Sequence, residues 1–348
     1  MSQLTGRGAP RDDQERFNCM IGNGVVPENQ TGRKSHSRTE PGDDDSNRLV
    51  GLYRRPGFRI RRAHQTAVAI FTSASAGLGI TTTQFGILYT LAHMQELDQA
   101  GLAKLVGLDR STTGLVLDLL ERRGTVERLA HPTDRRRRML ALTEAGRKLF
   151  ENTRQPAAEA VQTLFGSIGK TDAARFTDLM EDIVDAALDG SEAATNGPMR
   201  GLHRRPGFLI RRAHQIATGI FVRECRPFDV TPTRYGVLYA LRHMPATDQA
   251  TLAGLVRLDR STTAMVVGLL EERGLVERRT DKADRRRRVL TLTIPGRHLL
   301  DEIAPSAQKA AERLIQPVAV DDRDFLLTTL DRIVAQQDNT KVYQEDDQ

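Results

Sequence analysis

Apolar side chains recur every three or four positions through residues 51–125, which is the spacing of amphipathic helices. Phe58 and Phe71 fall on a first helix of about 20 residues. Thr81 stands where the cap of a second helix is expected, and Phe85 and Leu88 continue its apolar side. The region therefore begins with two amphipathic helices.

A shorter helix over residues 99–106 ends at Gly107, and Asp109 stands at the N-cap of the next helix, which ends near Gly124. We place the apolar side of this fourth helix on Leu115, Val116, Leu119 and Leu120. The residues then left on its outer side are Arg110, Ser111, Thr113, Gly114 and Leu117.

Residues 126–129 and 139–142 flank a turn with Pro132, and the second of these runs alternates apolar and polar side chains. This predicts a two-stranded hairpin with an arginine-rich tip. Helix, short turn, helix and basic hairpin is the order of a winged helix-turn-helix. The predicted fold class is therefore mainly α with small β-hairpin wings.

Two further helices follow the hairpin. Thr143 caps a long one with a kink at Pro156, and Thr171 caps a last one over residues 173–188. The second half of the chain follows the same plan through Val334.

The chain contains an internal duplication. Residues 51–150 laid on residues 201–300, with a constant offset of 150 and no gap, give 57 identities in 100 positions. Residues 51–65 alone match residues 201–215 at 13 of 15 positions. A unit of this length is a domain, so we predict two winged helix-turn-helix domains arranged as a pseudo-dimer.

Composition sets the predicted boundaries. Residues 189–200 are mostly small and polar with Gly and Pro, as linkers are, and the first 48 residues have almost no apolar periodicity. We divide the chain into a disordered tail (1–48), a first domain (49–188), a linker (189–200), a second domain (201–337) and a second disordered tail (338–348).

Positive charge is concentrated in two blocks. Residues 102–148 and 252–298 each carry 11 basic and 6 acidic side chains, so together they hold +10, more than the +6 of the whole chain. Such blocks suit a phosphate-binding surface, because each neutralised phosphate releases counterions. From charge alone, a solvated surface is an equal alternative.

Several protein classes are excluded by the sequence. No apolar run approaches the roughly 20 residues that cross a bilayer, and no apolar leader opens the chain. Cys19 and Cys225 are too few for a disulfide framework or a four-thiolate metal site, so we expect a reduced, cytoplasmic protein without metal or cofactor. Because no phosphate loop, zinc-protease motif or nucleophile elbow occurs, we do not expect an enzyme.

These motifs resemble the MarR family of transcription regulators. The resemblance is carried by residues 109–113 and 134–136, and by Leu142-Thr143 and Gly146-Arg147, with the corresponding residues 150 positions further on. It covers nearly all of residues 51–335. Family members are typically short chains that dimerise through their first and last helices, whereas here two copies are fused. The resemblance implies a repressor that places two recognition helices in successive major grooves of a pseudo-palindromic operator.

The residues expected at DNA open each recognition helix and each wing. Arg110 suits a guanine edge or a phosphate, and the hydroxyls suit phosphate or base contacts, although Ser111 and Thr112 could serve only as caps. The family's wing implies that Arg135 and Arg136 reach the minor groove or its flanking phosphates. The full set is Arg110, Ser111, Thr112, Thr113, Arg135 and Arg136, with Arg260, Ser261, Thr262, Thr263, Arg285 and Arg286 in the second copy.

The two copies differ within the predicted recognition helices. Gly114 corresponds to Ala264, Leu117 to Val267 and Asp118 to Gly268. A fused chain, unlike a homodimer, can therefore read unlike half-sites.

The resemblance also implies a small anionic effector, often an aromatic carboxylate, between the first two helices and the DNA-binding lobe; an acyl thioester is the related form. Arginine holds carboxylates in bidentate geometry. The candidate ligand-binding residues are Arg62, His64 and Tyr89, with Arg212, His214 and Tyr239 in the second copy; Arg61, Gln65, Arg211 and Gln215 are their neighbours. The same side chains could instead join the two first helices. The pair Phe85 and Tyr235 suggests that the two sites differ.

Three alternatives stay open. Cys225 lies between Arg223 and Arg226, which would favour a thiolate and a redox sensor, although Ser75 replaces it in the first copy. A non-specific architectural DNA-binding protein would show the same charge pattern. A dimer of tandem chains would place four recognition helices on the DNA in place of two.

Overall fold

The computed structural model describes residues 47–130, 138–187, 197–281 and 287–345. Repeat 1 contains α3 (Val50–Tyr53), α4 (Pro56–Ala74), η1 (Ala76–Leu78), α5 (Thr82–His93), α6 (Gln99–Val106), α7 (Arg110–Arg122), β1 (Val126–Ala130), β2 (Arg138–Leu142), α8 (Glu144–Phe165) and α9 (Lys170–Asp185). Repeat 2 contains α10 (Arg200–His203), α11 (Pro206–Glu224), η2 (Arg226–Phe228), α12 (Pro232–His243), α13 (Gln249–Val256), α14 (Arg260–Glu272), β3 (Val276–Thr280), β4 (Arg288–Leu292), α15 (Ile294–Ile315) and α16 (Val320–Glu345).

The predicted fold class is confirmed: within the described residues, each repeat is helical with one antiparallel hairpin. Val126 pairs with Leu142 in β1–β2, and Val276 pairs with Leu292 in β3–β4. The helices begin where side-chain caps allow it. Thr81 forms a reciprocal capping box with Gln84, and Asp109 and Thr143 accept hydrogen bonds from the backbone of the helices that they open.

The last helices differ from the sequence prediction. Helix α9 begins at Lys170, after Gly169, so Thr171 lies inside it and is not its cap. Asp172 in the first turn favours this earlier start through the helix dipole. Helix α16 continues to Glu345, through residues predicted to be disordered, because no Gly or Pro ends it.

Helix α8 runs from Glu144 to Phe165 with Pro156 inside it. The proline removes one hydrogen bond of the helix. The helix nevertheless continues, because it packs along α4 and α5.

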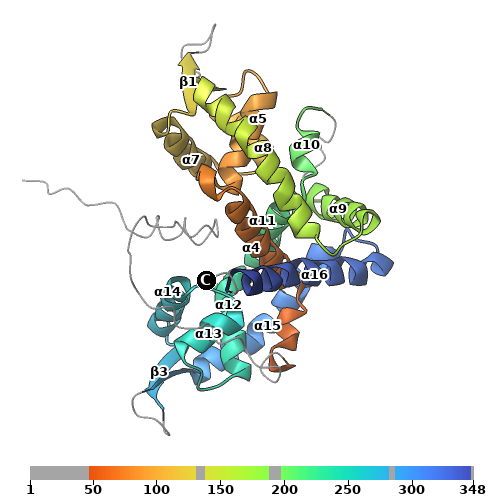
Figure 1. Ribbon diagram of the computed structural model, residues 1–348. Helices are drawn as coiled ribbons and strands as arrows, with labels where there is room; N and C mark the ends of the chain where they lie inside the picture. The colour runs from red at the N-terminus through yellow and green to blue at the C-terminus, as the bar shows by residue number, and fades with distance from the viewer. Residues whose placement is uncertain (1–46, 131–137, 188–196, 282–286, 346–348) are drawn as a thin grey trace, which may run out of the picture.

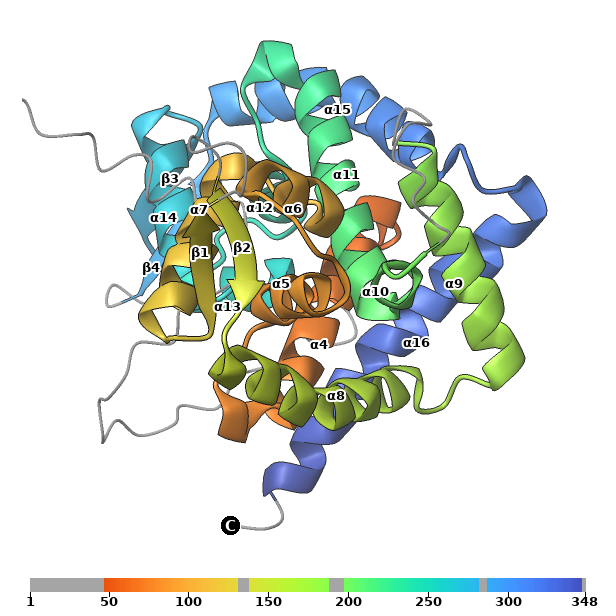
Figure 2. The ribbon, with the colours of Figure 1, turned by 90° about the horizontal axis from the view of Figure 1, so that it is seen from above.

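The two winged-helix lobes lie at opposite ends of the molecule, and the long helices fill the middle (Figure 1). The recognition helices α7 and α14 lie on the same side in this view. The last helix of each repeat packs on the first helix of the other: α16 lies along α4, and α9 along α11 (Figure 2). The repeats are therefore intertwined.

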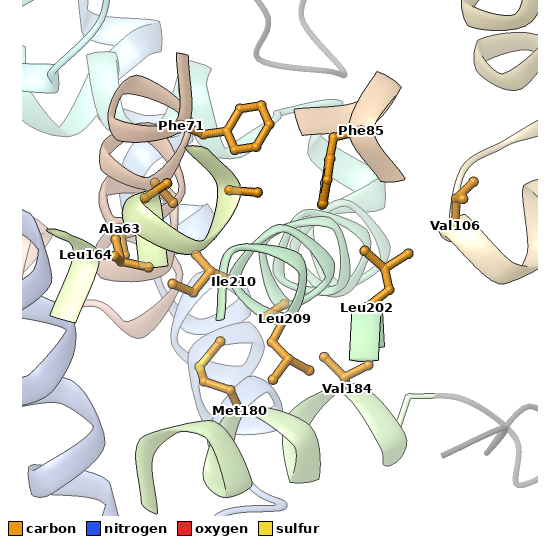
Figure 3. Packing of buried hydrophobic residues seen from close by; sticks show 14 of the residues in the cluster. Ala63, Phe71, Phe85, Val106, Leu164, Met180, Val184, Leu202, Leu209 and Ile210 are labelled. Carbon is orange, nitrogen blue, oxygen red and sulfur yellow. The ribbon is translucent and has the colours of Figure 1, made fainter. Parts of the chain in front are cut away.

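One apolar core joins the two repeats. Leu202, Leu209 and Ile210 of repeat 2 belong to the same buried cluster as Met180 and Val184 of repeat 1, as Figure 3 shows. The exchange is mutual, because Leu49 and Leu52, next to and within α3, are buried in the core of the repeat 2 lobe. Removing this much apolar surface from water is the main force that holds the repeats together.

Candidate nucleic-acid interface and effector cavities

Each recognition helix starts from an aspartate cap. Asp109 accepts hydrogen bonds from the backbone N and the Oγ1 of Thr112, at 2.8 and 2.5 Å, and its carbonyl accepts one from Thr113 Oγ1 at 2.8 Å. Burial by itself would raise the pKa of Asp109, but the bonds from Thr112 outweigh it and lower that pKa. Asp259 caps α14 in the same way, through Thr262 and Thr263.

The predicted outer side of the recognition helix is wrong by part of a turn. Thr113 and Leu117 are fully buried, at 0% exposure, whereas Leu115 and Leu119 are 42% and 48% exposed. The core stripe of α7 is Thr113, Val116, Leu117 and Leu120, because the methyl group of Thr113 completes the i, i+3, i+4, i+7 spacing.

Of the residues expected at DNA in the two helices, those with exposed side chains are Arg110, Ser111, Arg260 and Ser261. Thr112, Thr113 and Thr263 are buried, and Thr262 is half-buried and bonded to its cap. These threonines build the helix starts, so their expected DNA contacts are not supported.

The outer sides of α7 and α14 differ in shape and charge. The paired positions that differ in residue and are buried in neither copy are Gly114 and Ala264, Leu115 and Met265, Asp118 and Gly268, and Arg122 and Glu272. Leu117 and Val267, also expected to matter for reading, are both buried. Asp118 forms a 3.0 Å ion pair with Arg128 of β1, and Gly268 offers no such group. The two readers are therefore not equivalent surfaces.

The wing tips fall partly outside the described residues. Arg135, Arg136, Arg285 and Arg286 lie there, so their expected contacts stay predictions. Arg138 and Arg288 open the returning strands with exposed side chains. Arg287 pairs with Asp248, the cap of α13, at 2.5 Å.

The first helices of the two repeats meet at the centre of the molecule. The rings of His64 and His214 stack with their centroids 5.0 Å apart and their planes at 18°. Burial, His214 and Arg211 lower the pKa of His64 to about 3, and burial and Arg61 lower that of His214 to about 4. Both rings are therefore neutral at physiological pH.

Arginines of each first helix reach across to the other repeat. Arg61 Nη2 donates to Val256 O at 2.7 Å, at the carboxyl end of α13. Arg211 donates to Val106 O and Gly107 O, at the carboxyl end of α6. Helices α6 and α13 directly precede the recognition helices, so each first helix holds the winged-helix lobe of the other repeat.

The expected ligand residue Arg212 takes part in the same contact. Its Nη1 donates to Gly107 O at 3.1 Å, and Arg62 Nη1 donates to Gln65 Oε1 at 3.3 Å. For Arg212 the structure thus favours the interface role that the sequence left open.

Two equivalent cavities lie beside the stacked histidines. The first cavity encloses about 730 Å³ of space, open solvent at its mouth included, and the second about 590 Å³. His64, Arg205 and Arg211 line the first; His214, Arg55 and Arg61 line the second. Each cavity therefore takes its histidine from one repeat and its arginines from the other.

The cavities are apolar apart from these cations. The first is walled by Phe71, Phe85 and Phe208, the second by Phe58, Phe221 and Tyr235, and no acidic side chain lines either among the described residues. Burial lowers the pKa of Arg211 to about 9 and that of Arg61 to about 10, with help from the adjacent arginines, so both stay charged at neutral pH. Two unopposed cations in an apolar cavity suit an anion with a flat apolar body.

Only His64 and His214 among the six expected ligand residues line these cavities; Arg62, Arg212, Tyr89 and Tyr239 do not. Tyr89 stacks on His93, and its hydroxyl approaches Gly201 of the other repeat. The sequence prediction missed Arg55 and Arg205, although both fall in the segment that is nearly identical in the two copies.

Cys225 is buried at the end of α11. Burial, together with Glu224, raises the pKa of its thiol to about 11, and Arg55 opposes this only in part. Arg223 and Arg226, which were expected to favour a thiolate, do not contribute to this shift of the pKa. A protonated, inaccessible thiol reacts slowly with oxidants, so the geometry opposes the redox alternative.

In the described part of the chain, no group of His, Cys, Asp and Glu side chains is placed to hold a metal ion. No helix found there is both long and apolar enough to cross a bilayer.

Comparison with known proteins finds the same family in both repeats. Models of the MarR family match residues 80–137 and 228–287, one in each repeat. Over 135 residues the chain is 33% identical to a transcriptional regulatory protein named for the hcr operon of Thauera aromatica, covering 38% of this chain and 81% of that protein. Over 133 residues it is 30% identical to the HTH-type transcriptional repressor NicR of Pseudomonas putida, covering 38% of this chain and 84% of that protein.

A solved structure, that of the transcriptional repressor CouR bound to a 23-mer DNA duplex, has a TM-score of 0.37 and 30% identity. The match covers 39% of this chain and 96% of that one.

The fold and the paired recognition helices thus define a winged helix-turn-helix DNA-binding protein. The chain belongs to the MarR family of transcription regulators and carries the family's domain twice.

Proposed function

We propose that this chain is a sequence-specific repressor that binds a pseudo-palindromic operator with both repeats of one chain. A small aromatic carboxylate, or its thioester, releases it by binding in the two cavities. The observation that carries the proposal is that Arg61 and Arg211 each line a cavity and also bond the helix that precedes a recognition helix.

This double role supplies a route from ligand to DNA. A carboxylate in the first cavity competes with the backbone carbonyls of Val106 and Gly107 for the Arg211 guanidinium. When Arg211 turns to the ligand, α6 and the recognition helix α7 lose a tether to repeat 2. A ligand shifts an equilibrium only by its difference in affinity between the two states, and this tether provides such a difference.

The DNA-binding part is tested by selection from random duplexes with purified full-length protein, followed by competition with random DNA. A specific repressor keeps its selected duplex, whereas an architectural binder loses it to the competitor. Changing Arg135 and Arg136 together to Ala should reduce the salt slope of binding by roughly one unit per lost phosphate contact. An unchanged slope would refute the wing contacts.

The effector part is tested by adding a panel of aromatic acids and thioesters to the protein–duplex complex. We expect release by at least one compound, and loss of that response in the double variant Arg55→Gln with Arg205→Gln. The matched control is Arg54→Gln, next in sequence but exposed. If the double variant still responds, Arg55 and Arg205 do not hold the effector.

A further inference from the structure

We propose that the two cavities bind different aromatic acids: the second cavity takes one with a ring hydroxyl, and the first takes one without. This inference rests on the proposed function, because it requires both cavities to hold effectors. It goes further by assigning a ligand class to each of them.

The cavities share one anion-binding arrangement. Every residue that lines the second cavity has its counterpart 150 positions away in the lining of the first. The arginines and the histidine are the same in both. Charge therefore selects acids in both cavities, and it cannot separate one acid from another.

The walls differ at four of these positions. Phe85, Val68, Val161 and Thr82 of the first cavity correspond to Tyr235, Thr218, Ala311 and Pro232 of the second. Three of the four exchanges replace a hydrocarbon side chain by one that is smaller or carries a hydroxyl. The fourth removes the Thr82 hydroxyl from the first turn of α5.

The central exchange is Phe85 for Tyr235. The Arg205 guanidinium carbon lies 5.1 Å from the centroid of the Phe85 ring, and the Arg55 guanidinium carbon also lies 5.1 Å from that of Tyr235. The two rings thus hold the same position beside one of the two arginines of each cavity. The phenolic oxygen is what distinguishes them.

The Tyr235 hydroxyl is a proton donor at neutral pH. Burial raises its pKa, and Arg55 offsets only part of that rise, through its charge and through a hydrogen bond to the phenolic oxygen. The oxygen thus already accepts from Arg55, and its proton can still be donated. A hydroxyl on the ligand can accept a hydrogen bond from Tyr235. An unsubstituted ring cannot, so it leaves a buried donor without an acceptor. The cost of that unmatched donor discriminates between the two ligands more strongly than the hydrogen bond itself. Thr218 Oγ1 already donates to His214 O at 3.0 Å and can still accept a hydrogen bond from a ligand.

Calorimetric titration of the full chain with benzoate and with 4-hydroxybenzoate tests the assignment. We expect Tyr235→Phe to weaken 4-hydroxybenzoate binding about tenfold and to leave benzoate within about twofold. The reciprocal variant Phe85→Tyr should convert the first cavity into a second tight site for 4-hydroxybenzoate. Thr82→Val is the control, because it removes a hydroxyl that the second cavity lacks, and it should not change the affinity of the second cavity.

The outcomes separate this inference from the proposed function. If neither acid binds the wild-type chain, the effector part of the proposed function fails, and this inference fails with it. If both acids bind and Tyr235→Phe weakens them equally, or weakens neither, only the assignment of ligands is overturned. Thermal melting of each variant checks that it is folded.

Discussion

Positions 107 and 257 show how one residue makes the repeats unequal. The backbone is left-handed at both, with φ of 63° at Gly107 and 54° at Arg257. Only glycine adopts this conformation without strain. At Gly107 a side chain would also meet Arg212, since an added Cβ would lie 2.3 Å from Arg212 Nη1. The backbone between α6 and α7 is thus unstrained at Gly107, and the backbone between α13 and α14 is strained at Arg257.

We therefore expect opposite effects from substitutions at these two positions. Gly107→Ala should lower the free energy of unfolding by about 2 kcal/mol, through backbone strain and the displaced Arg212 hydrogen bond. Arg257→Gly should raise it by about 0.5 kcal/mol, because relief of strain exceeds the added entropy of the unfolded chain. Urea denaturation measures both, and effects of the same sign would contradict this account.

The stacked histidines predict how stability depends on pH. Their folded-state pKa values, about 3 for His64 and about 4 for His214, lie below the ordinary value of 6.5. Below pH 6.5 the two histidines bind protons in the unfolded chain but not in the folded chain. Their full contribution to the free energy of unfolding is therefore present above pH 6.5, and it is lost as the pH decreases towards 4. Each histidine contributes a loss of about 1.4 kcal/mol per pH unit in that range.

Denaturation of the wild type and of His64→Phe with His214→Phe, at pH 8, 6 and 5, checks this expectation. The double variant keeps two stacked rings but cannot take up protons there. Its stability should change less between pH 8 and pH 5 than that of the wild type. Equal changes would show that other groups govern the acid sensitivity.

At the scale of elements, capping residues and apolar spacing were enough to predict most helices and both hairpins. Asp109 and Thr143 are local signals, because each bonds to the helix that it opens. The rotation of α7 was not predictable in the same way, since the two stripes containing Leu115 or Leu117 both satisfy helical spacing. Packing against the rest of the lobe decides between them.

The cavities show a similar limit. Their histidines were predicted from the first helices, but Arg55 and Arg205 enter a cavity of the other repeat. A contact of this kind depends on how the repeats cross, and the local pattern of residues does not specify that crossing. The near-identity of residues 51–65 and 201–215 singled out Arg55 and Arg205, but it did not indicate which part of the molecule they contact.

The exposed sides of the recognition helices lead to a prediction about operator symmetry. Asp118→Gly gives α7 the residue that α14 has at this position and removes one of the two carboxylates paired with Arg128, leaving Glu121. We expect the half-site selected by repeat 1 to become more like that of repeat 2. Loss of the Asp118 negative charge should also strengthen binding to random DNA at low salt.

Selection from random duplexes with wild type and variant measures both effects. Leu117→Val is the matched control, because it also exchanges the residues of the two copies but changes a buried position. It should lower stability slightly and leave the selected sequence unchanged. If Leu117→Val alters the half-site as much as Asp118→Gly does, exposed side chains are not what distinguishes the readers.

At the scale of the whole molecule, fusion and intertwining act together. Leu52 of repeat 1 is buried in the repeat 2 lobe, and Leu202 of repeat 2 is buried in the core that contains repeat 1. Neither repeat can leave without exposing these apolar contacts to water. The arrangement provides two readers at a spacing set by α4, α9, α11 and α16, the helices that cross between the repeats.

One chain should therefore be enough for one operator. Native mass measurement of the complex with a minimal selected duplex should give one protein chain per duplex, because both readers already lie on the same side of the molecule (Figure 1). Cutting a protease site introduced within residues 189–196 should leave the halves associated and DNA binding largely intact, since the shared core, rather than the covalent link, holds the readers. Two chains on a minimal duplex would favour a dimer of tandem chains. Loss of DNA binding after cleavage would mean that the linker, through the effective concentration it provides, is what keeps the repeats together.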